Sequence, residues 1–343
     1  MEIKHTLESI AKLAGVSRGT VSRVVNNELG VRPAVREKVL KIIQETGYHP
    51  NVQARSLAGG KTENIGVVVF GNDPNFLTHH IFYEVLQGIQ NYLTLNHYDL
   101  LLFANRSETD YEYWKRIGDK RKVDGLIVMG ENIREEYLVY YHEKKLPCVL
   151  VGKRHFHQIP LFCVTSDYQR GAYEGTKHLL EQGRKRILFL RGYPDTYHEG
   201  QKFIGYREAL KEHGIGLDVS CIVDAQARQE VAFEQMNRLL DRGEVFDGIF
   251  AGNDLMAFGA IEALKSRSID VPQDVSVVGY DDIQAAQYFH PSLSTVRQDK
   301  QTLGKKATEL LMKLLNKEVP NDQPIDIMVE SQLIVRESSQ LQV

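Results

Sequence analysis

Two groups of polar residues in this sequence could do chemistry, and the first group could bind DNA. Arg18 and Arg23 lie near the N-terminus, separated by small and apolar residues. An arginine can donate two hydrogen bonds to O6 and N7 of a guanine, which gives about 1–3 kcal/mol of discrimination between bases. Neighbouring hydroxyl and amide groups could bind phosphates and fix the register on DNA without reading its sequence. The candidates for that role are Thr6, Ser17, Ser22 and Asn26.

The second group could bind a small polar ligand. Asn253 and Asp281 each lie just past an apolar stretch that is typical of a buried strand. Ligands of open α/β sheets bind beyond the carboxyl ends of the strands. Amide and carboxylate groups offer the donors and acceptors that sugar hydroxyls need. Either residue could instead cap a helix, and one side chain could do both.

The N-terminal group requires two short helices joined by a tight turn. Leu7, Ile10 and Ala14 share one helical face, and Gly15 then ends the pattern where the chain should turn. Ser17 is suited to cap a second helix, because its hydroxyl can accept a hydrogen bond from a free backbone N–H of the first turn. This arrangement predicts a helix-turn-helix, whose second helix enters the major groove of DNA. A third helix should follow over residues 33–46.

The charge distribution favours nucleic-acid binding at one end of the chain only. Residues 1–61 carry ten basic and five acidic side chains, which is a net charge of +5. The whole chain has a net charge of −3, so the remainder carries −8. A basic segment on an acidic body is typical of a protein that binds phosphates through that segment.

Length and composition indicate a multidomain protein of the cytoplasm. The 343 residues suit two or three domains, and 42% of them are hydrophobic, enough for sizeable cores. No apolar run approaches the ~20 residues that cross a bilayer, and residues 1–5 begin no apolar segment of the signal-peptide kind. We therefore expect no membrane partner. Cys148, Cys163 and Cys221 are too widely spaced to predict a disulfide framework or a zinc site.

From Ile65 onwards the sequence predicts an α/β fold with doubly wound parallel sheets. Near-continuous apolar runs, typical of strands buried on both faces, cover residues 65–70, 99–104, 125–129, 148–151, 187–191, 248–251 and 275–280. Stretches of helical spacing between them cover residues 81–95, 171–182, 201–213, 230–241 and 255–266. Two similar blocks are visible, near residues 64–163 and 164–295.

Several short motifs resemble the LacI/GalR family of bacterial transcription regulators, in family order over nearly the whole chain. They are Thr20–Asn26, Tyr48–Asn51, Ala54–Ala58, Ile65–Gly66, Ala251–Asp254 and Val278–Asp282. The resemblance implies a helix-turn-helix domain at residues 1–49, a hinge helix and linker at 50–61, and a periplasmic-binding-protein-like core at 62–343 for effector binding and dimerisation. Its first subdomain would comprise 64–163 with 297–325, and its second 164–296 with 326–340, joined by three crossovers.

The resemblance also implies roles in DNA binding. In the family the positions of Arg18 and Gly19 choose the operator, and that of Arg23 contacts a base edge. Inside a helix Gly19 would cost about 1 kcal/mol relative to alanine, and it could let the helix approach the groove. The alternative is an ordinary solvated helix face.

The hinge helix is the second implied DNA contact. Asn51 suits its N-cap, and Ala54 and Leu57 would share one of its faces. So short a helix is unstable alone, and in the family it orders when two copies meet on DNA. Leu57 matches the residue that wedges into the minor groove, although it could be a simple linker hydrophobe. The implied partners are a second copy of the chain, as a homodimer, and a palindromic operator in double-stranded DNA.

In the core the resemblance implies an effector site, with departures from the family. The matching positions are Ile81, Phe82, His198, Lys202, Asn253 and Asp281. Lys202 stands where the family usually has an arginine, so the planar donor fork is lost, and Ala225 stands where many members have an aromatic residue. The catabolite control branch of the family, which responds to a phosphocarrier protein, also has a lysine at the position of Lys202. We expect a sugar or sugar phosphate as effector, with a phosphocarrier protein as the alternative signal.

Other classes of function have little support in the sequence. His79 and His80 are adjacent, but no third ligand follows at a plausible spacing, so we expect neither a metal nor another cofactor. No G-x-G-x-x-G segment opens a helix after a predicted strand, no complete Walker loop occurs, and no G-x-S-x-G elbow follows a predicted strand. A passive solute-binding protein would have an export signal in place of residues 1–60, and a sugar-processing enzyme would turn over a candidate sugar. We therefore expect a non-enzymatic, effector-responsive regulator, most simply a repressor of carbohydrate-utilisation genes.

Overall fold

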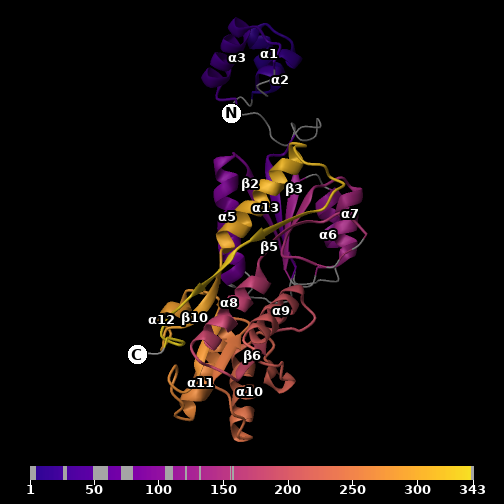
Figure 1. Cartoon of the computed structure of the whole chain (residues 1–343). Helices are drawn as coiled ribbons and strands as arrows, with labels where there is room; N and C mark the ends of the chain where they lie inside the picture. The colour runs from indigo at the N-terminus through magenta and orange to yellow at the C-terminus, as the bar shows by residue number, and fades with distance from the viewer. Residues whose placement is uncertain are drawn as a thin grey trace. The chain divides into compact units, whose positions relative to one another are not determined.

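The computed structural model describes residues 5–25, 29–48, 61–70, 80–104, 111–119, 122–130, 133–154, 156 and 158–340 (Figure 1). The chain divides into two compact units, residues 1–62 and residues 63–343. The first unit has one hydrophobic core and the second has a core on each face of its two sheets, and each unit is described by itself below.

The described residues of the first unit form helices α1 (Leu7–Ala14), α2 (Arg18–Val25) and α3 (Pro33–Thr46). A capping box opens α1, because Thr6 Oγ1 accepts from Ser9 N at 3.2 Å and Ser9 Oγ accepts from Thr6 N at 2.8 Å. Gly15 ends α1 with φ of +67°, a left-handed conformation that glycine adopts without strain. Ile10, Val21 and other apolar side chains of the three helices form one small core. The predicted helix-turn-helix is therefore confirmed.

The second unit begins with a parallel six-stranded sheet in the order β11-β5-β4-β3-β1-β2. Its strands are β1 (Asn64–Phe70), β2 (Asp99–Ala104), β3 (Gly125–Gly130), β4 (Cys148–Val151), β5 (Phe162–Ser166) and β11 (Ile325–Val329). Helices α5 (His80–Leu95) and α13 (Lys300–Leu315) cover one face. Helices α6 (Tyr111–Asp119) and α7 (Glu135–Glu143) cover the other. Alternate residues of β1 enter the two cores, which explains the continuous apolar run in the sequence.

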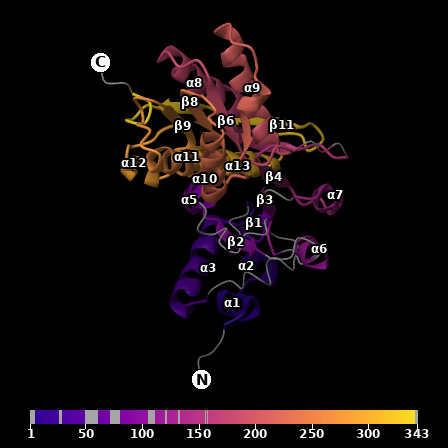
Figure 2. The ribbon, with the colours of Figure 1, turned by 90° about the horizontal axis from the view of Figure 1, so that it is seen from below.

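A second six-stranded sheet has the order β12-β10-β9-β8-β6-β7. Its strands are β6 (Ile187–Arg191), β7 (Ile222–Asp224), β8 (Gly248–Ala251), β9 (Ser276–Asp281), β10 (Ser294–Gln298) and β12 (Ser331–Ile334). Figure 2 shows α8 (Tyr168–Glu181) and α9 (Tyr197–Glu212) on one side of this sheet, opposite α10 (Gln229–Asp241) and α11 (Asp254–Ser266). The short helices η2 (Val219–Cys221) and α12 (Ala285–Tyr288) complete the second subdomain.

The chain crosses between the two sheets at three places, after β5, after β10 and after β11. The boundaries of the subdomains differ slightly from those predicted. β5 extends to Ser166, and β11 pairs with it in parallel from Ile325 to Val329. Residues 164–166 and 326–329, which we assigned to the second subdomain, therefore lie in the first sheet. Only β12 returns to the second sheet, where it pairs antiparallel with β10.

Helix α13 lies directly against α5 (Figure 1). A Cβ on Gly304 would lie 2.1 Å from Val85 O, and one on Gly88 would lie 2.1 Å from Gln301 O, so only glycine permits this approach. The close packing brings the start of α13 next to the first turns of α5. It therefore places Lys300, at the crossover from the second sheet, beside Glu84 of the first subdomain.

Candidate functional site

Helix α2 separates an apolar face from a basic face. Val21 and Val24 are buried in the core of the first unit, whereas Arg18, Gly19 and Arg23 are exposed. The two guanidinium groups are thus available to an external partner, as major-groove reading requires. Ser22 is half-buried on the same helix.

Two of the hydroxyl groups that we predicted to bind phosphates also cap helices. Thr6 caps α1, and Ser17 caps α2, since Ser17 Oγ accepts from Thr20 N at 3.1 Å. Both residues are exposed. We expected Gly19 to cost stability because we placed it inside a helix. That placement was wrong, because Gly19 is the second residue of α2. A Cβ there would meet only Ser17 Oγ at 3.7 Å, an ordinary contact. The candidates Asn26, Asn51, Ala54 and Leu57 lie outside the described residues.

The G-x-S-x-G pattern at residues 15–19 is not a nucleophile elbow. Such an elbow holds its serine between a strand and a helix, whereas Ser17 lies between helices α1 and α2 and caps the second. The residues that could bind a small ligand lie instead at the carboxyl edge of the second sheet.

Lys202 is the central charge of that edge, and it is buried at 4% exposure. Its ammonium group donates to Glu199 Oε1 at 2.8 Å and to Gly252 O at 2.7 Å. It also lies 4.6 Å from the ring centroid of Tyr280. Burial would lower the pKa of Lys202, but Glu199 and Asp281 more than offset that effect and the pKa is raised. Lys202 is therefore a charged group held by protein partners on several sides.

Glu199 and His198 complete this cluster on α9. Glu199 Oε2 accepts from Gly192 N at 2.8 Å, which ties the carboxylate to the end of β6. The His198 ring lies 5.8 Å from the ring of Tyr168, centroid to centroid. Burial, with the positive charges of Lys202 and Arg154, holds the pKa of His198 well below its ordinary value. His198 is thus neutral near pH 7, so its 4.0 Å approach to Glu199 is not an ion pair.

Asp281 ends β9 in a left-handed conformation, with φ of +111°. Its Oδ1 accepts from Gln298 Nε2 at 2.6 Å, and its backbone oxygen accepts from Lys300 Nζ at 2.7 Å. Gln298 Oε1 in turn accepts from Ser166 Oγ at 2.7 Å, and Lys300 Nζ pairs with Glu84 Oε1 at 3.0 Å. A polar chain therefore connects Asp281 to the first subdomain through both ends of the crossover between β10 and α13.

The structure gathers some predicted effector residues and not others. Asn253 N-caps α11 by accepting from Met256 N at 2.8 Å, and its amide donates to Ala227 O at 3.1 Å. The capping alternative is thus present, whatever else Asn253 binds. Ile81 and Phe82, in the first turn of α5, pack against the core of the first subdomain.

Sequence reasoning missed several members of this cluster. Glu199 could have been found, because it lies three residues before Lys202 and so on the same helical face. Tyr168 lies far from Gln298 and Lys300 in the sequence, and no local pattern links any of the three to Asp281. Ala225 is fully buried and leaves no aromatic face at its position.

Within the described residues, no group of three or more His, Cys, Asp or Glu side chains could hold a metal ion. The three cysteines are free thiols. Among the residues that the structure describes, no helix is long and apolar enough to span a membrane.

Comparisons with known proteins identify the relatives of this chain. Residues 6–51 match the model of bacterial regulatory proteins of the lacI family, and residues 176–339 match a periplasmic binding protein-like domain. Catabolite control protein A of Priestia megaterium is 34% identical over 91% of this chain and 93% of its own. A transcriptional regulator CelR–cellobiose complex superposes with a TM-score of 0.73 at 31% identity, over 97% of this chain and 99% of that one.

A lac repressor dimer bound to operator and the anti-inducer ONPF superposes with a TM-score of 0.79 at 25% identity, covering 98% of this chain and 99% of that one. The matches span the helix-turn-helix unit and the two-sheet core together. With its exposed basic helix and its polar cluster at the strand ends, the chain belongs to the LacI family of bacterial transcriptional regulators.

Proposed function

We propose that this regulator is a cytoplasmic repressor of carbohydrate-utilisation genes that binds a palindromic operator as a homodimer and responds to a sugar or sugar phosphate. The observation that carries the proposal is the presence, in one chain, of an exposed Arg18 and Arg23 face and of a buried polar cluster around Lys202 and Asp281. We propose residues 1–49 as the DNA-binding domain, 50–61 as hinge and linker, and 62–343 as the sensing core without catalytic turnover.

The DNA-binding half of the proposal assigns two kinds of contact. Arg18, Gly19 and Arg23 read base edges in the major groove. Thr6, Ser17, Ser22 and Asn26 bind phosphates, and Asn51, Ala54 and Leu57 belong to a hinge helix in the minor groove. A related repressor forms a dimer on its operator, which supports the two-fold arrangement.

The effector half of the proposal places the ligand at the cluster of His198, Lys202, Asn253 and Asp281, with Ile81 and Phe82 contributing from the first subdomain. The carboxylate of Asp281 offers acceptors to hydroxyl groups, and the ring of Tyr168 offers an apolar face. Lys202 acts here mainly through Glu199 and the Tyr280 ring, which it holds in place. A relative that binds cellobiose supports a sugar as ligand.

A second candidate function is that of a catabolite-control-type regulator whose signal is a phosphocarrier protein. Two observations favour it. Lys202 is already occupied by Glu199 and Gly252, and Ala225 provides no ring on which a sugar could stack. The 34% identity to catabolite control protein A is consistent with this alternative.

A thermal-shift experiment on the full chain distinguishes the two candidates. Binding to the native state alone raises its stability by RT ln(1 + [L]/Kd). Cellobiose, glucose and glucose 6-phosphate are the probes for a sugar site, and a phosphocarrier protein, with and without phosphate, is the probe for a partner. A sugar-induced shift that disappears in Asp281→Asn, but persists in the exposed-loop control Asp322→Asn, supports the first candidate. A shift with the phosphocarrier alone supports the second, and no shift with any probe contradicts both.

A further inference from the structure

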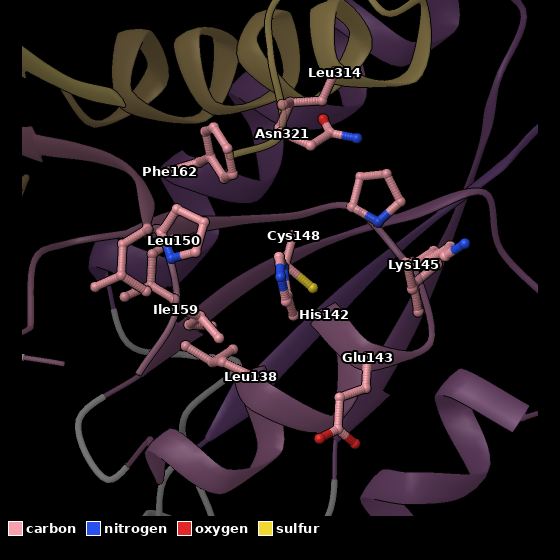
Figure 3. Close-up of a pocket in the computed structure, with 14 residues that line it drawn as sticks. Leu138, His142, Glu143, Lys145, Cys148, Leu150, Ile159, Phe162, Leu314 and Asn321 are labelled. Atoms are coloured by element: carbon pink, nitrogen blue, oxygen red, sulfur yellow. The ribbon is translucent and has the colours of Figure 1, made fainter. Parts of the chain in front are cut away.

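A cavity of about 500 Å³ lies in the first subdomain, away from the cluster around Lys202 (Figure 3). Its walls come from the end of α7, the start of β4, the residues leading into β5, and the end of α13 with the loop that follows. These segments meet at the amino edge of the first sheet, because Cys148 opens β4 and Phe162 opens β5. The effector cluster lies at carboxyl ends of strands, so the two sites are different.

The interior of the cavity is apolar. Leu150, Phe162 and Leu314 are buried side chains of its wall. Cys148 also lines it, and in Figure 3 the sulfur of Cys148 lies in the middle of the labelled side chains. Burial raises the pKa of the Cys148 thiol, so this group is protonated at neutral pH and acts as part of the apolar wall.

Polar groups are confined to the margin of the cavity. His142, Glu143, Lys145 and Asn321 line it and are exposed. Among the described residues, the side chains of His142 and Asn321 have no hydrogen-bond partner. In Figure 3 the carboxylate of Glu143 points away from Cys148. The cavity therefore offers hydrogen-bonding groups only at its margin, and most of its surface can make only apolar contacts.

We propose that this cavity is a second ligand site, for a small and mainly apolar molecule with one hydrogen-bonding end. The volume lies within the range of about 300–1,000 Å³ that holds drug-sized ligands. A sugar does not fit this chemistry, because most of its hydroxyls would be left unpaired at a cost of about 1–3 kcal/mol each. An aromatic ring system fits, with its apolar body against Leu150 and Phe162 and its one polar group at the exposed margin, where Asn321 offers a hydrogen-bond partner.

The test uses 8-anilino-1-naphthalenesulfonate, an aromatic molecule with one anionic end, and the full-length chain without DNA or sugar. Cys148 is half-buried, whereas Cys163 and Cys221 are buried. Maleimide should therefore reach Cys148 before the two buried thiols, although slowly because its raised pKa leaves little thiolate, and saturating probe should slow this labelling at least ten-fold further. Because neither DNA nor a sugar is present, the result is independent of the proposed repressor function.

Two variants locate the probe. Asn321→Trp changes an exposed residue at the mouth and should weaken probe binding at least ten-fold in calorimetric titration. Asp322→Trp, at the next residue, does not line the cavity and is the matched control. Ile159→Trp fills the cavity from a half-buried position and should act like Asn321→Trp. Unslowed labelling of Cys148, or equal binding to Asn321→Trp and Asp322→Trp, would overturn the proposal.

Discussion

The ion pair between Lys300 and Glu84 predicts an unusual order of mutational effects. The Lys300 side chain is 1% exposed, and its partners are Glu84 Oε1 at 3.0 Å and Asp281 O at 2.7 Å. Glu84→Ala leaves a buried ammonium with the Asp281 carbonyl oxygen alone. Removing one partner of a buried pair costs about 3–5 kcal/mol. We expect about 3 kcal/mol, because the Glu84 side chain is 33% exposed and water can reach the gap.

Lys300→Met should cost less than Glu84→Ala. The methionine keeps most of the apolar stem and removes the charge, and the partly exposed Glu84 can then be solvated. The main loss is the hydrogen bond to Asp281 O, about 1–2 kcal/mol. Glu84→Gln keeps an acceptor oxygen and should fall between the two. The order of the three variants therefore tests whether a buried charge, and not packing alone, determines the stability of this crossover.

Urea unfolding at pH 7 and one fixed protein concentration measures the three changes. Trp114 is the single tryptophan of the chain and is fully buried in the first subdomain, so its fluorescence reports unfolding of the part that contains Glu84. Lys305→Met, at an exposed position of α13, is the control for a lost surface charge. A larger loss in Lys300→Met than in Glu84→Ala would refute the reasoning.

Three further predictions concern DNA binding and pH. Deleting residues 1–60 should abolish operator binding in a mobility-shift assay while the core still unfolds cooperatively, and the affinity of the full chain should fall steeply with salt. Leu57→Ala should weaken binding to operator far more than binding to random DNA of equal length, and equal losses would identify Leu57 as a linker hydrophobe. The pKa of His198 is lower in the folded chain than in the unfolded chain, so on acidification the unfolded chain takes up the proton first. The contribution of His198 to the free energy of unfolding is therefore complete above pH ~6.5 and is lost as the pH falls towards the pKa of the folded state. His198→Gln should flatten this slope in acid, leaving the smaller contribution of His178, whose pKa burial also lowers.

Much of the fold could be predicted because the relevant signals are local. The glycine turn at Gly15 and the apolar runs of β1, β3 and β9 determine their own elements. β5, β7, β10, β11 and β12 were missed. β11 and β12 alternate partly buried and exposed residues at a sheet edge, so they lack the continuous apolar run. Their sheet assignment depends on pairing with strands far away in the sequence, which a local pattern cannot contain.

The candidate site was predictable only where a residue type and its position in an element were informative together. Asp281 follows a buried strand, and the strand-end rule located it. Lys300 could not be found, because its meaning comes from Glu84, 216 residues earlier in the chain. Lys202 was predicted as a ligand-facing group, whereas its contacts in the structure are with Glu199 and Gly252.

The pairing of β11 with β5 has a consequence for how the protein is made. Ile325 pairs with Phe162, so the edge of the first sheet stays open until the ribosome has synthesised nearly the whole chain. The described helices α1, α2 and α3 are close together in the sequence and share one core, so the helix-turn-helix unit can fold as soon as it emerges. For most of synthesis a basic, DNA-competent unit would therefore be attached to a sensing core that is not yet complete. A premature stop before residue 325 should yield a polypeptide that retains the helix-turn-helix unit but lacks a complete core for binding an effector.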